Sequence, residues 1–169
     1  EALPYLEIMS TWPNNRLKLE IIKTLEGIPA QSSAKLLDLL AADPSLEIKR
    51  AAIIGMGLSG HVEMIPRLRE IFLRHAECRP SIISALPRIG GPQSRDMLFD
   101  FLENDELLKP LKISKKEYDD LKIAVLKALS EIGDEASMNK IAEFADKNSN
   151  NSMFKKDILS STGKNLLIK

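Results

Sequence analysis

The chain has 169 residues, of which 44% are hydrophobic, 5% aromatic and 28% charged, and its formal net charge at pH 7 is zero. Many aliphatic and few aromatic residues are typical of stacked helices rather than of a β-sandwich or barrel, and zero net charge argues against general binding to polyanions. One cysteine excludes an internal disulfide, and no apolar run approaches the roughly 18 residues of a membrane span. We therefore expect a cytoplasmic domain without a transmembrane segment.

The predicted elements recur along the chain as pairs of helices. A partial unit over residues 1–12 is followed by pairs over 16–41, 46–75, 79–103 and 115–147, and by a partial unit over 152–169. The first helix of each pair is marked by an apolar residue followed by a basic one, at Leu17-Lys18, Ile48-Lys49, Cys78-Arg79 and Leu121-Lys122. These marks lie 31, 30 and 43 residues apart, and the long last step predicts an insertion over residues 104–116.

The same steps align three further sets of residues without gaps. The first helices align at Leu25, Met56, Leu86 and Leu129, the turns at Pro29, Gly60, Gly90 and Gly133, and the second helices at Leu37, Leu68, Leu98 and Ile141. A period of about 30 residues built from two helices is typical of a helical solenoid, in which each unit buries its apolar face against its neighbours. We predict an all-α fold of about four helical pairs in a single repeat domain over residues 1–169.

The register continues at both ends of these four pairs. Residues 2–6 match residues 64–68 in sequence, and Pro4 aligns with Pro66. The chain is therefore expected to begin within the second helix of an earlier unit. Residues 154–159 resemble the start of another first helix. We interpret the chain as a fragment of a longer array.

Local signals predict how several helices begin and pack. Asp43-Pro44 is expected to supply a capping residue and a first-turn proline, and Ser114 has the spacing of a capping box with Glu117. Pro66 and Pro87 are expected to kink helices from inside. Small residues in the helix after Asp43 predict close approach of its neighbours; they are Ala51, Ala52, Gly55 and Gly57.

Two segments, DPSLEIKRAAIIGMGLSGHVEMIPRL and DDLKIAVLKALSEIGDEASMNKI, resemble HEAT repeats, specifically the short HEAT-like units first associated with phycobilisome lyases. The resemblance covers nearly the whole chain and implies a right-handed α-α superhelix, with the first helices on the convex side and the second helices on the concave side. It is specific for fold and not for function, because this repeat serves unrelated proteins.

The family pattern places a basic residue early in each first helix, which is matched here by Lys18, Lys49, Arg79 and Lys122. It also has Gly-Asp at the turn, which only Gly133-Asp134 retains. Two interpretations of this basic row remain open. The side chains could bond to carbonyl groups at helix ends, or they could be free to bind an acidic ligand.

The residues give no sign of catalysis, a metal site or a cofactor. His61, His75 and Cys78 are the only imidazoles and the only thiol, and a zinc site needs about four ligands. Cys78 occupies an apolar position of the repeat and is expected to be packed in the core. No Gly-x-Ser-x-Gly, P-loop or dinucleotide-binding motif occurs. We expect no enzyme in this segment.

The leading functional hypothesis is a non-catalytic scaffold for protein–protein interaction, whose partner is an acidic protein or peptide. The candidate binding residues are Arg67, Arg74, Arg95, Lys18, Lys49, Arg79 and Lys122. Two alternatives remain. The resemblance implies a lyase or lyase subunit acting on a phycobilin-bearing protein. A nucleic-acid-binding solenoid could use the arginines between residues 50 and 79, although neutral overall charge argues against it.

Overall fold

The computed structural model describes residues 2–28 and 30–148, and over these residues it contains ten α-helices, three short 3-10 helices and no strand. The prediction of an all-α fold is confirmed, while the partial unit over residues 152–169 lies outside the described residues. None of the described helices combines the length and the apolar character needed to cross a membrane. The chain divides into two compact units, residues 1–91 and 92–169, and each is described by itself.

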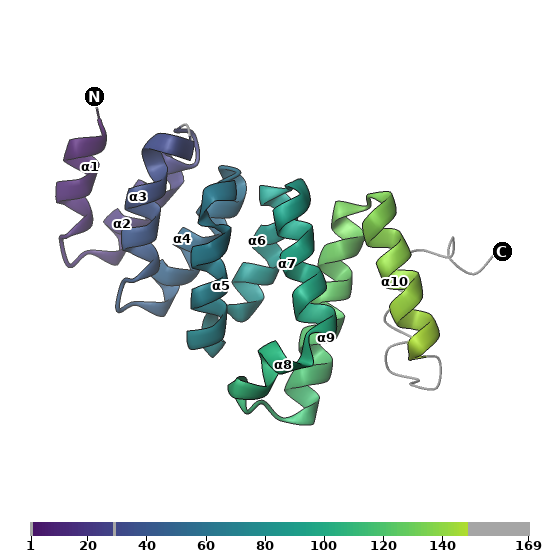
Figure 1. Cartoon of the computed structure of the whole chain (residues 1–169). Helices are drawn as coiled ribbons and strands as arrows, with labels where there is room; N and C mark the ends of the chain where they lie inside the picture. The colour runs from purple at the N-terminus through teal and green to yellow at the C-terminus, as the bar shows by residue number, and fades with distance from the viewer. Residues whose placement is uncertain (1, 29, 149–169) are drawn as a thin grey trace. The chain divides into compact units, whose positions relative to one another are not determined.

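The first unit holds six α-helices and two 3-10 turns. They are α1 (Leu3–Ser10), α2 (Asn15–Leu25), α3 (Ala30–Ala41), α4 (Leu46–Leu58), η1 (Val62–Met64), α5 (Ile65–Arg74), η2 (Ala76–Cys78) and α6 (Arg79–Ile89). Figure 1 shows α1, α3 and α5 as one row of helices, with α2, α4 and α6 as a second row behind it. Helix α4 is at the centre of this unit, because it contacts α2, α3 and α6.

The second unit contains three long helices, α7, α9 and α10, and two short ones that join the first two of them. They are α7 (Gly91–Glu103), α8 (Asp105–Leu108), η3 (Lys109–Leu111), α9 (Lys115–Ile132) and α10 (Glu135–Lys147). Helices α8 and η3 occupy the predicted insertion. The predicted capping box of α9 is present: the Ser114 hydroxyl accepts a hydrogen bond from the Glu117 backbone N–H, and the Glu117 carboxylate accepts one from the Ser114 backbone N–H.

The residues that the repeat register aligns on the helices are all buried. Each of the eight side chains has a relative exposure of 0%; they are Leu25, Met56, Leu86, Leu129, Leu37, Leu68, Leu98 and Ile141. The turn glycines also behave alike, since Gly60, Gly90 and Gly133 all have a positive φ, between 66° and 72°. A backbone conformation of this kind favours glycine because it lacks a Cβ atom.

Two local predictions about helix starts are wrong. Ser45, not Asp43, is the N-cap of α4, because the Asp43 carboxylate instead binds the Lys18 ammonium group and the Ser45 backbone N–H. Pro66 lies in the first turn of α5, where it costs no helical hydrogen bond, because the 3-10 turn η1 precedes the helix. Pro87 does lie inside α6, as predicted.

Candidate functional site

The four basic residues of the repeat row have different environments. Lys18 forms an ion pair with Asp43, with 2.6 Å between Nζ and Oδ2. Arg79 donates to the backbone carbonyl of Phe72, near the end of α5, at 3.1 Å. Lys122 donates to the backbone carbonyl of Leu102, near the end of α7. Structural bonding of the basic row is therefore observed at three of its four positions.

Lys49 is the exception. This side chain makes no hydrogen bond and no ion pair within residues 2–28 and 30–148. Two carboxylates interact with it at longer range, Asp43 and Glu77, and these already lie against Lys18 and His75, at 2.6 and 3.4 Å. The Lys49 ammonium group is thus the cation of the row that is left available to a ligand.

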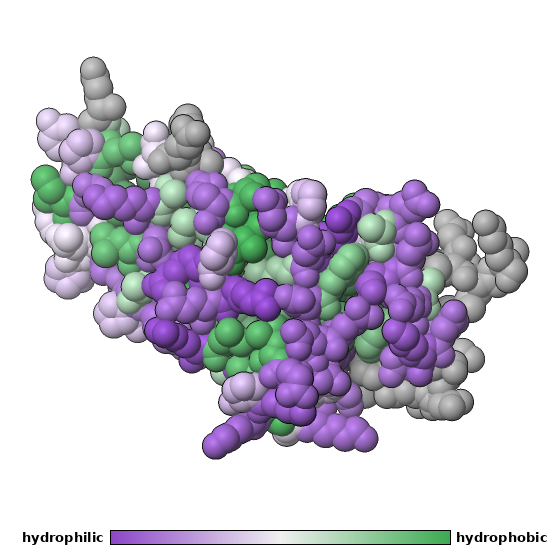
Figure 2. Space-filling view, viewed as in Figure 1, coloured by the Kyte–Doolittle hydropathy of each residue, from purple (hydrophilic) through white to green (hydrophobic). Residues whose placement is uncertain are grey.

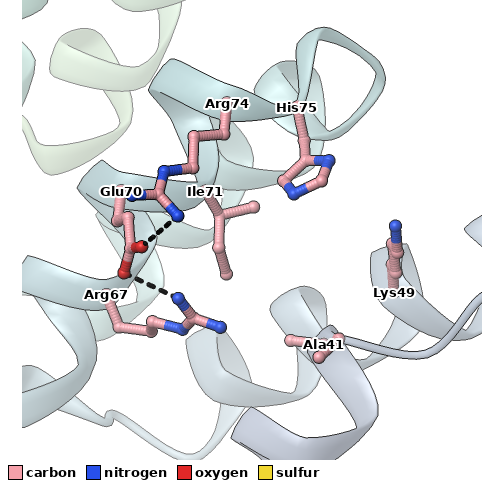
Figure 3. A pocket seen from close by; sticks show the side chains of 8 residues that line it. Ala41, Lys49, Arg67, Glu70, Ile71, Arg74 and His75 are labelled. Atoms are coloured by element: carbon pink, nitrogen blue, oxygen red, sulfur yellow. Dashed lines mark hydrogen bonds and ion pairs between the residues drawn. The ribbon is translucent and has the colours of Figure 1, made fainter.

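Lys49 faces a pocket of about 160 Å³ in the first unit (Figure 3). The end of α3, the first turn of α4, one face of α5 and the residue after α5 form its wall. The lining residues are Ala41, Ala42, Lys49, Arg67, Glu70, Ile71, Arg74 and His75. We call this the basic pocket, because Lys49, Arg67 and Arg74 face a single carboxylate among the lining residues.

Helix α5 supplies four of these side chains because of its periodicity. Glu70, Ile71 and Arg74 follow Arg67 by three, four and seven residues, so all four share one face of the helix. Ile71 is the buried member of this face and forms apolar wall, while the charged members remain accessible. Figure 3 shows Lys49 on α4 across the pocket from this charged group.

The Glu70 carboxylate is held between two arginines. Arg67 Nη1 lies 2.6 Å from one carboxylate oxygen and Arg74 Nη1 lies 2.9 Å from the other. The hydrogen bond from Arg67 keeps the pKa of Glu70 below its usual value, with a further contribution from the charge of Arg74. Arg67 also donates to Asp38 on α3 at 2.8 Å. The Glu70 carboxylate therefore pairs with the two arginines and not with Lys49.

Arg95, the remaining predicted binding residue, lies in the second unit. Its Nη1 atom is 2.9 Å from Asp134 Oδ2, and its guanidinium group lies 5.8 Å from the centre of the Phe99 ring. Asp134 is also the N-cap of α10, where it accepts from the Ser137 N–H. Arg95 thus links α7 to the start of α10 through the one Gly-Asp turn that the sequence retains.

Lys122, another member of the basic row, is buried in a cluster of polar contacts in the second unit. Besides the Leu102 carbonyl, its Nζ atom binds Asp105 Oδ1 at 3.2 Å and lies 4.7 Å from the centre of the Tyr118 ring. Burial lowers the pKa of this amine, against the effect of Asp105, and Tyr118 donates its hydroxyl hydrogen to the same carboxylate. The cluster attaches α8 of the insertion to α9 and provides two hydrogen-bond acceptors for the amine.

Ser33, His61 and Glu63 have the order of a nucleophile, a base and an acid, which sequence analysis did not anticipate. Ser33 Oγ is 3.0 Å from His61 Nε2, and His61 Nδ1 is 3.1 Å from Glu63 Oε1. However, the Ser33 and His61 side chains are fully buried, so no substrate reaches the hydroxyl. The contact joins α3 to the turn before η1 and is structural.

The other residues that sequence analysis considered for catalysis or metal binding do not form a site among the described residues. The Cys78 thiol is buried, as predicted, and burial raises its pKa, so it is a poor nucleophile. Within residues 2–28 and 30–148, no group of three or more His, Cys, Asp and Glu side chains could hold a metal ion.

Three of the seven predicted binding residues, Lys49, Arg67 and Arg74, therefore meet at one place, and four lie elsewhere. Sequence analysis placed Arg67, Glu70 and Arg74 together on a second helix and missed the contribution of His75 to this place. Lys49 comes from another helix, and its position depends on packing.

No family model matches the sequence, and neither curated proteins nor solved structures give a match.

Proposed function

We propose that the chain is a non-catalytic interaction module, a HEAT-like solenoid whose first unit binds an acidic segment of a protein partner in the basic pocket. The observation that carries this proposal is the position of Lys49, which forms no direct ion pair among the described residues and faces Arg67 and Arg74 across the pocket. The superhelical arrangement of the repeats is part of the proposal and rests on the sequence register.

The volume of the pocket favours a side chain over a cofactor. Pockets that hold drug-sized ligands usually measure about 300–1,000 Å³, whereas the basic pocket measures about 160 Å³. A single glutamate or aspartate side chain suits this space. Its carboxylate would accept hydrogen bonds from Lys49 and Arg74, and charge-assisted bonds of this kind are stronger than neutral ones.

The charges of the pocket also favour an anion. Three basic side chains line it, Lys49, Arg67 and Arg74, against the carboxylate of Glu70, and the Asp38 carboxylate pairs with Arg67 from outside the lining. Arg67 is held by both Asp38 and Glu70, so little of its side-chain entropy is lost when it binds a ligand. A preorganised cationic pocket on a neutral chain selects a local acidic group rather than a long polyanion.

Binding of nucleic acid is supported less well by the arginines between residues 50 and 79, because several of them are already bonded. Arg50 donates to the Glu77 carbonyl at 2.9 and 3.0 Å, Arg67 is paired with Asp38 and Glu70, and Arg79 binds the Phe72 carbonyl. Phosphate-backbone binding needs many accessible cations along a surface.

We predict that Lys49→Glu weakens binding of a fluorescein-labelled peptide of six glutamates by about tenfold or more, because it replaces an attractive charge in the pocket by a repulsive one. Fluorescence anisotropy with the full chain measures the dissociation constant. Lys23→Glu is the matched control, since Lys23 is an exposed lysine of the same unit outside the pocket, and it should leave binding nearly unchanged.

The same titration separates the alternatives. Binding to the pocket should weaken with salt and should be stronger for hexaglutamate than for a single-stranded oligonucleotide of equal charge. If Lys49→Glu and Lys23→Glu weaken binding equally, the pocket is not the site. If the oligonucleotide binds more tightly than the peptide, nucleic acid is the better partner class.

A further inference from the structure

Each of the three cations of the basic pocket keeps hydrogen-bond donors that no described residue uses. Arg67 donates from Nε to Asp38 and from Nη1 to Glu70, at 2.8 and 2.6 Å, which leaves the two hydrogens of Nη2. Arg74 contacts Glu70 through Nη1 alone, at 2.9 Å, and Lys49 makes no direct bond within residues 2–28 and 30–148. A guanidinium group has five N–H donors and an ammonium group has three. A ligand can therefore bond to all three side chains without displacing Glu70.

The unused donors are accessible from solvent. The Arg67 and Arg74 side chains are 35% and 72% exposed, and Figure 2 shows strongly hydrophilic residues gathered over α3 and α5 on the face in view. In Figure 3 the guanidinium group of Arg67 extends toward the side of the pocket on which Lys49 lies. Three cations from α4 and α5 thus line one open space of about 160 Å³.

A phosphate monoester matches this arrangement better than a carboxylate does. It has three strong acceptor oxygens and a charge of about −1.5 to −2 at neutral pH, whereas a carboxylate has two oxygens and a single charge. With three oxygens, each of Lys49, Arg67 and Arg74 can bond to an oxygen of its own. The three cations also outnumber the two carboxylates that pair with the arginines, Glu70 and Asp38. The second negative charge of the ligand is therefore attracted by a local surplus of positive charge.

Resting on the proposed function, we infer that the acidic group of the partner is a phosphorylated serine or threonine, whose phosphate binds Lys49, Arg67 and Arg74. A phosphoserine side chain is only slightly longer than a glutamate side chain, so the same pocket admits it. A phosphate placed against a group of basic side chains can form about one to three new charge-assisted hydrogen bonds. Phosphorylation of the partner then controls whether it binds to this module.

The experiment uses the full chain and four fluorescein-labelled peptides that differ only at one central position of the same glycine and alanine sequence. That position carries serine, glutamate, phosphoserine or the methyl ester of phosphoserine. The methyl ester is a phosphodiester with one negative charge and two free oxygens, like each phosphate of a nucleic-acid backbone. Fluorescence anisotropy at about pH 8, where a phosphate monoester is a dianion, measures the four dissociation constants.

We expect the phosphoserine peptide to bind about tenfold more tightly than the glutamate peptide, because it has an additional charge and a third oxygen. The methyl ester should bind no more tightly than glutamate. Arg67→Gln should reduce the preference for phosphoserine over glutamate to about twofold or less, since it removes one of the three cations. Circular dichroism shows whether this variant is folded, and the comparison of the four peptides on the natural chain does not depend on it.

Arg88→Gln is the matched control for Arg67→Gln. Arg88 is an exposed arginine in the last turn of α6, in the same unit but outside the basic pocket. The preference for phosphoserine should persist in this variant. Equal loss of the preference in Arg67→Gln and Arg88→Gln would show that the pocket does not recognise the phosphate.

The remaining outcomes separate this inference from the proposed function. If the phosphoserine and glutamate peptides bind equally and Lys49→Glu weakens both, the pocket holds an acidic group and only the inference is wrong. If Lys49→Glu weakens neither, the proposed function fails and the inference fails with it. If the methyl ester binds as tightly as phosphoserine, the third oxygen has no part in recognition, which overturns the inference. If inorganic phosphate binds as tightly as the phosphoserine peptide, the ligand is a free phosphate ion and not a protein segment, which also overturns it.

Discussion

Asp43→Ala is expected to lower the free energy of unfolding of the first unit by about 3–5 kcal/mol, because it leaves a buried ammonium group without its counter-charge. The Lys18 and Asp43 side chains are only 11% and 7% exposed, and their charged atoms are 2.6 Å apart. Asp43 also accepts the Ser45 N–H at 2.8 Å, before α4 begins. Urea unfolding followed by Trp12 fluorescence measures the loss in this unit.

The double variant Lys18→Met with Asp43→Ala is the control for that effect. It removes both charges, so most of the penalty for an unpaired buried ion should disappear, and its free energy of unfolding should exceed that of Asp43→Ala by about 1–3 kcal/mol. Equal stability of the single and double variants would show that Asp43 acts through the Ser45 turn and not through the ion pair.

The ion pair also predicts a dependence on pH. Burial alone would raise the pKa of Asp43, but the hydrogen bonds from Lys18 and Ser45, with the lysine charge, outweigh it and lower the pKa below the ordinary value of 3.8. The folded state therefore binds this proton more weakly than the unfolded state. The stabilisation is present above pH 3.8 and is lost as the pH falls through the folded-state pKa.

The measurement for this prediction is the free energy of unfolding between neutral pH and about pH 3. It should fall more steeply below about pH 4 in the natural chain than in the double variant without Lys18 and Asp43. Parallel curves for the two proteins would contradict it.

Gly57→Ala is expected to destabilise the first unit by about 1–3 kcal/mol, although alanine favours helix by about 1 kcal/mol. A Cβ atom at Gly57 would lie 3.0 Å from Ala85 Cα and Cβ and 3.1 Å from the Ala85 carbonyl oxygen. These atoms are mostly backbone of α6, so α4 and α6 would have to move apart. Gly57→Val should be more destabilising still, because it adds two further carbons at the same contact.

Gly55→Ala on the same helix is the matched control. A Cβ there would meet the Ile22 Cγ2 atom at 3.2 Å and the Leu37 Cδ2 atom at 3.3 Å. Both are ends of side chains that can shift slightly, so we expect stability within about 1 kcal/mol of the natural chain. Chemical denaturation of both variants tests the contrast. A Gly57→Ala variant as stable as Gly55→Ala would show that α4 and α6 are not held by this contact.

The sequence determines which residues are buried on each helix, because helical periodicity is local. Leu37, Leu68, Leu98 and Ile141 align in the repeat register and are all fully buried, and the Ser114 capping box forms between residues three apart. The prediction for Asp43 failed because a residue distant in sequence competes for its side chain. Asp43 would cap α4 by its local sequence, but Lys18, 25 residues earlier, binds its carboxylate.

The repeated pairs, their turns and their buried residues thus follow from the sequence itself, because interactions over three or four residues and a constant period specify them. Tertiary structure decides what each basic residue binds. Equivalent positions place Lys18 against Asp43, Lys122 against the Leu102 carbonyl and Lys49 at the basic pocket. The groups around these residues come from other parts of the chain, and their distances depend on how the helices pack, which the period of the repeat does not encode.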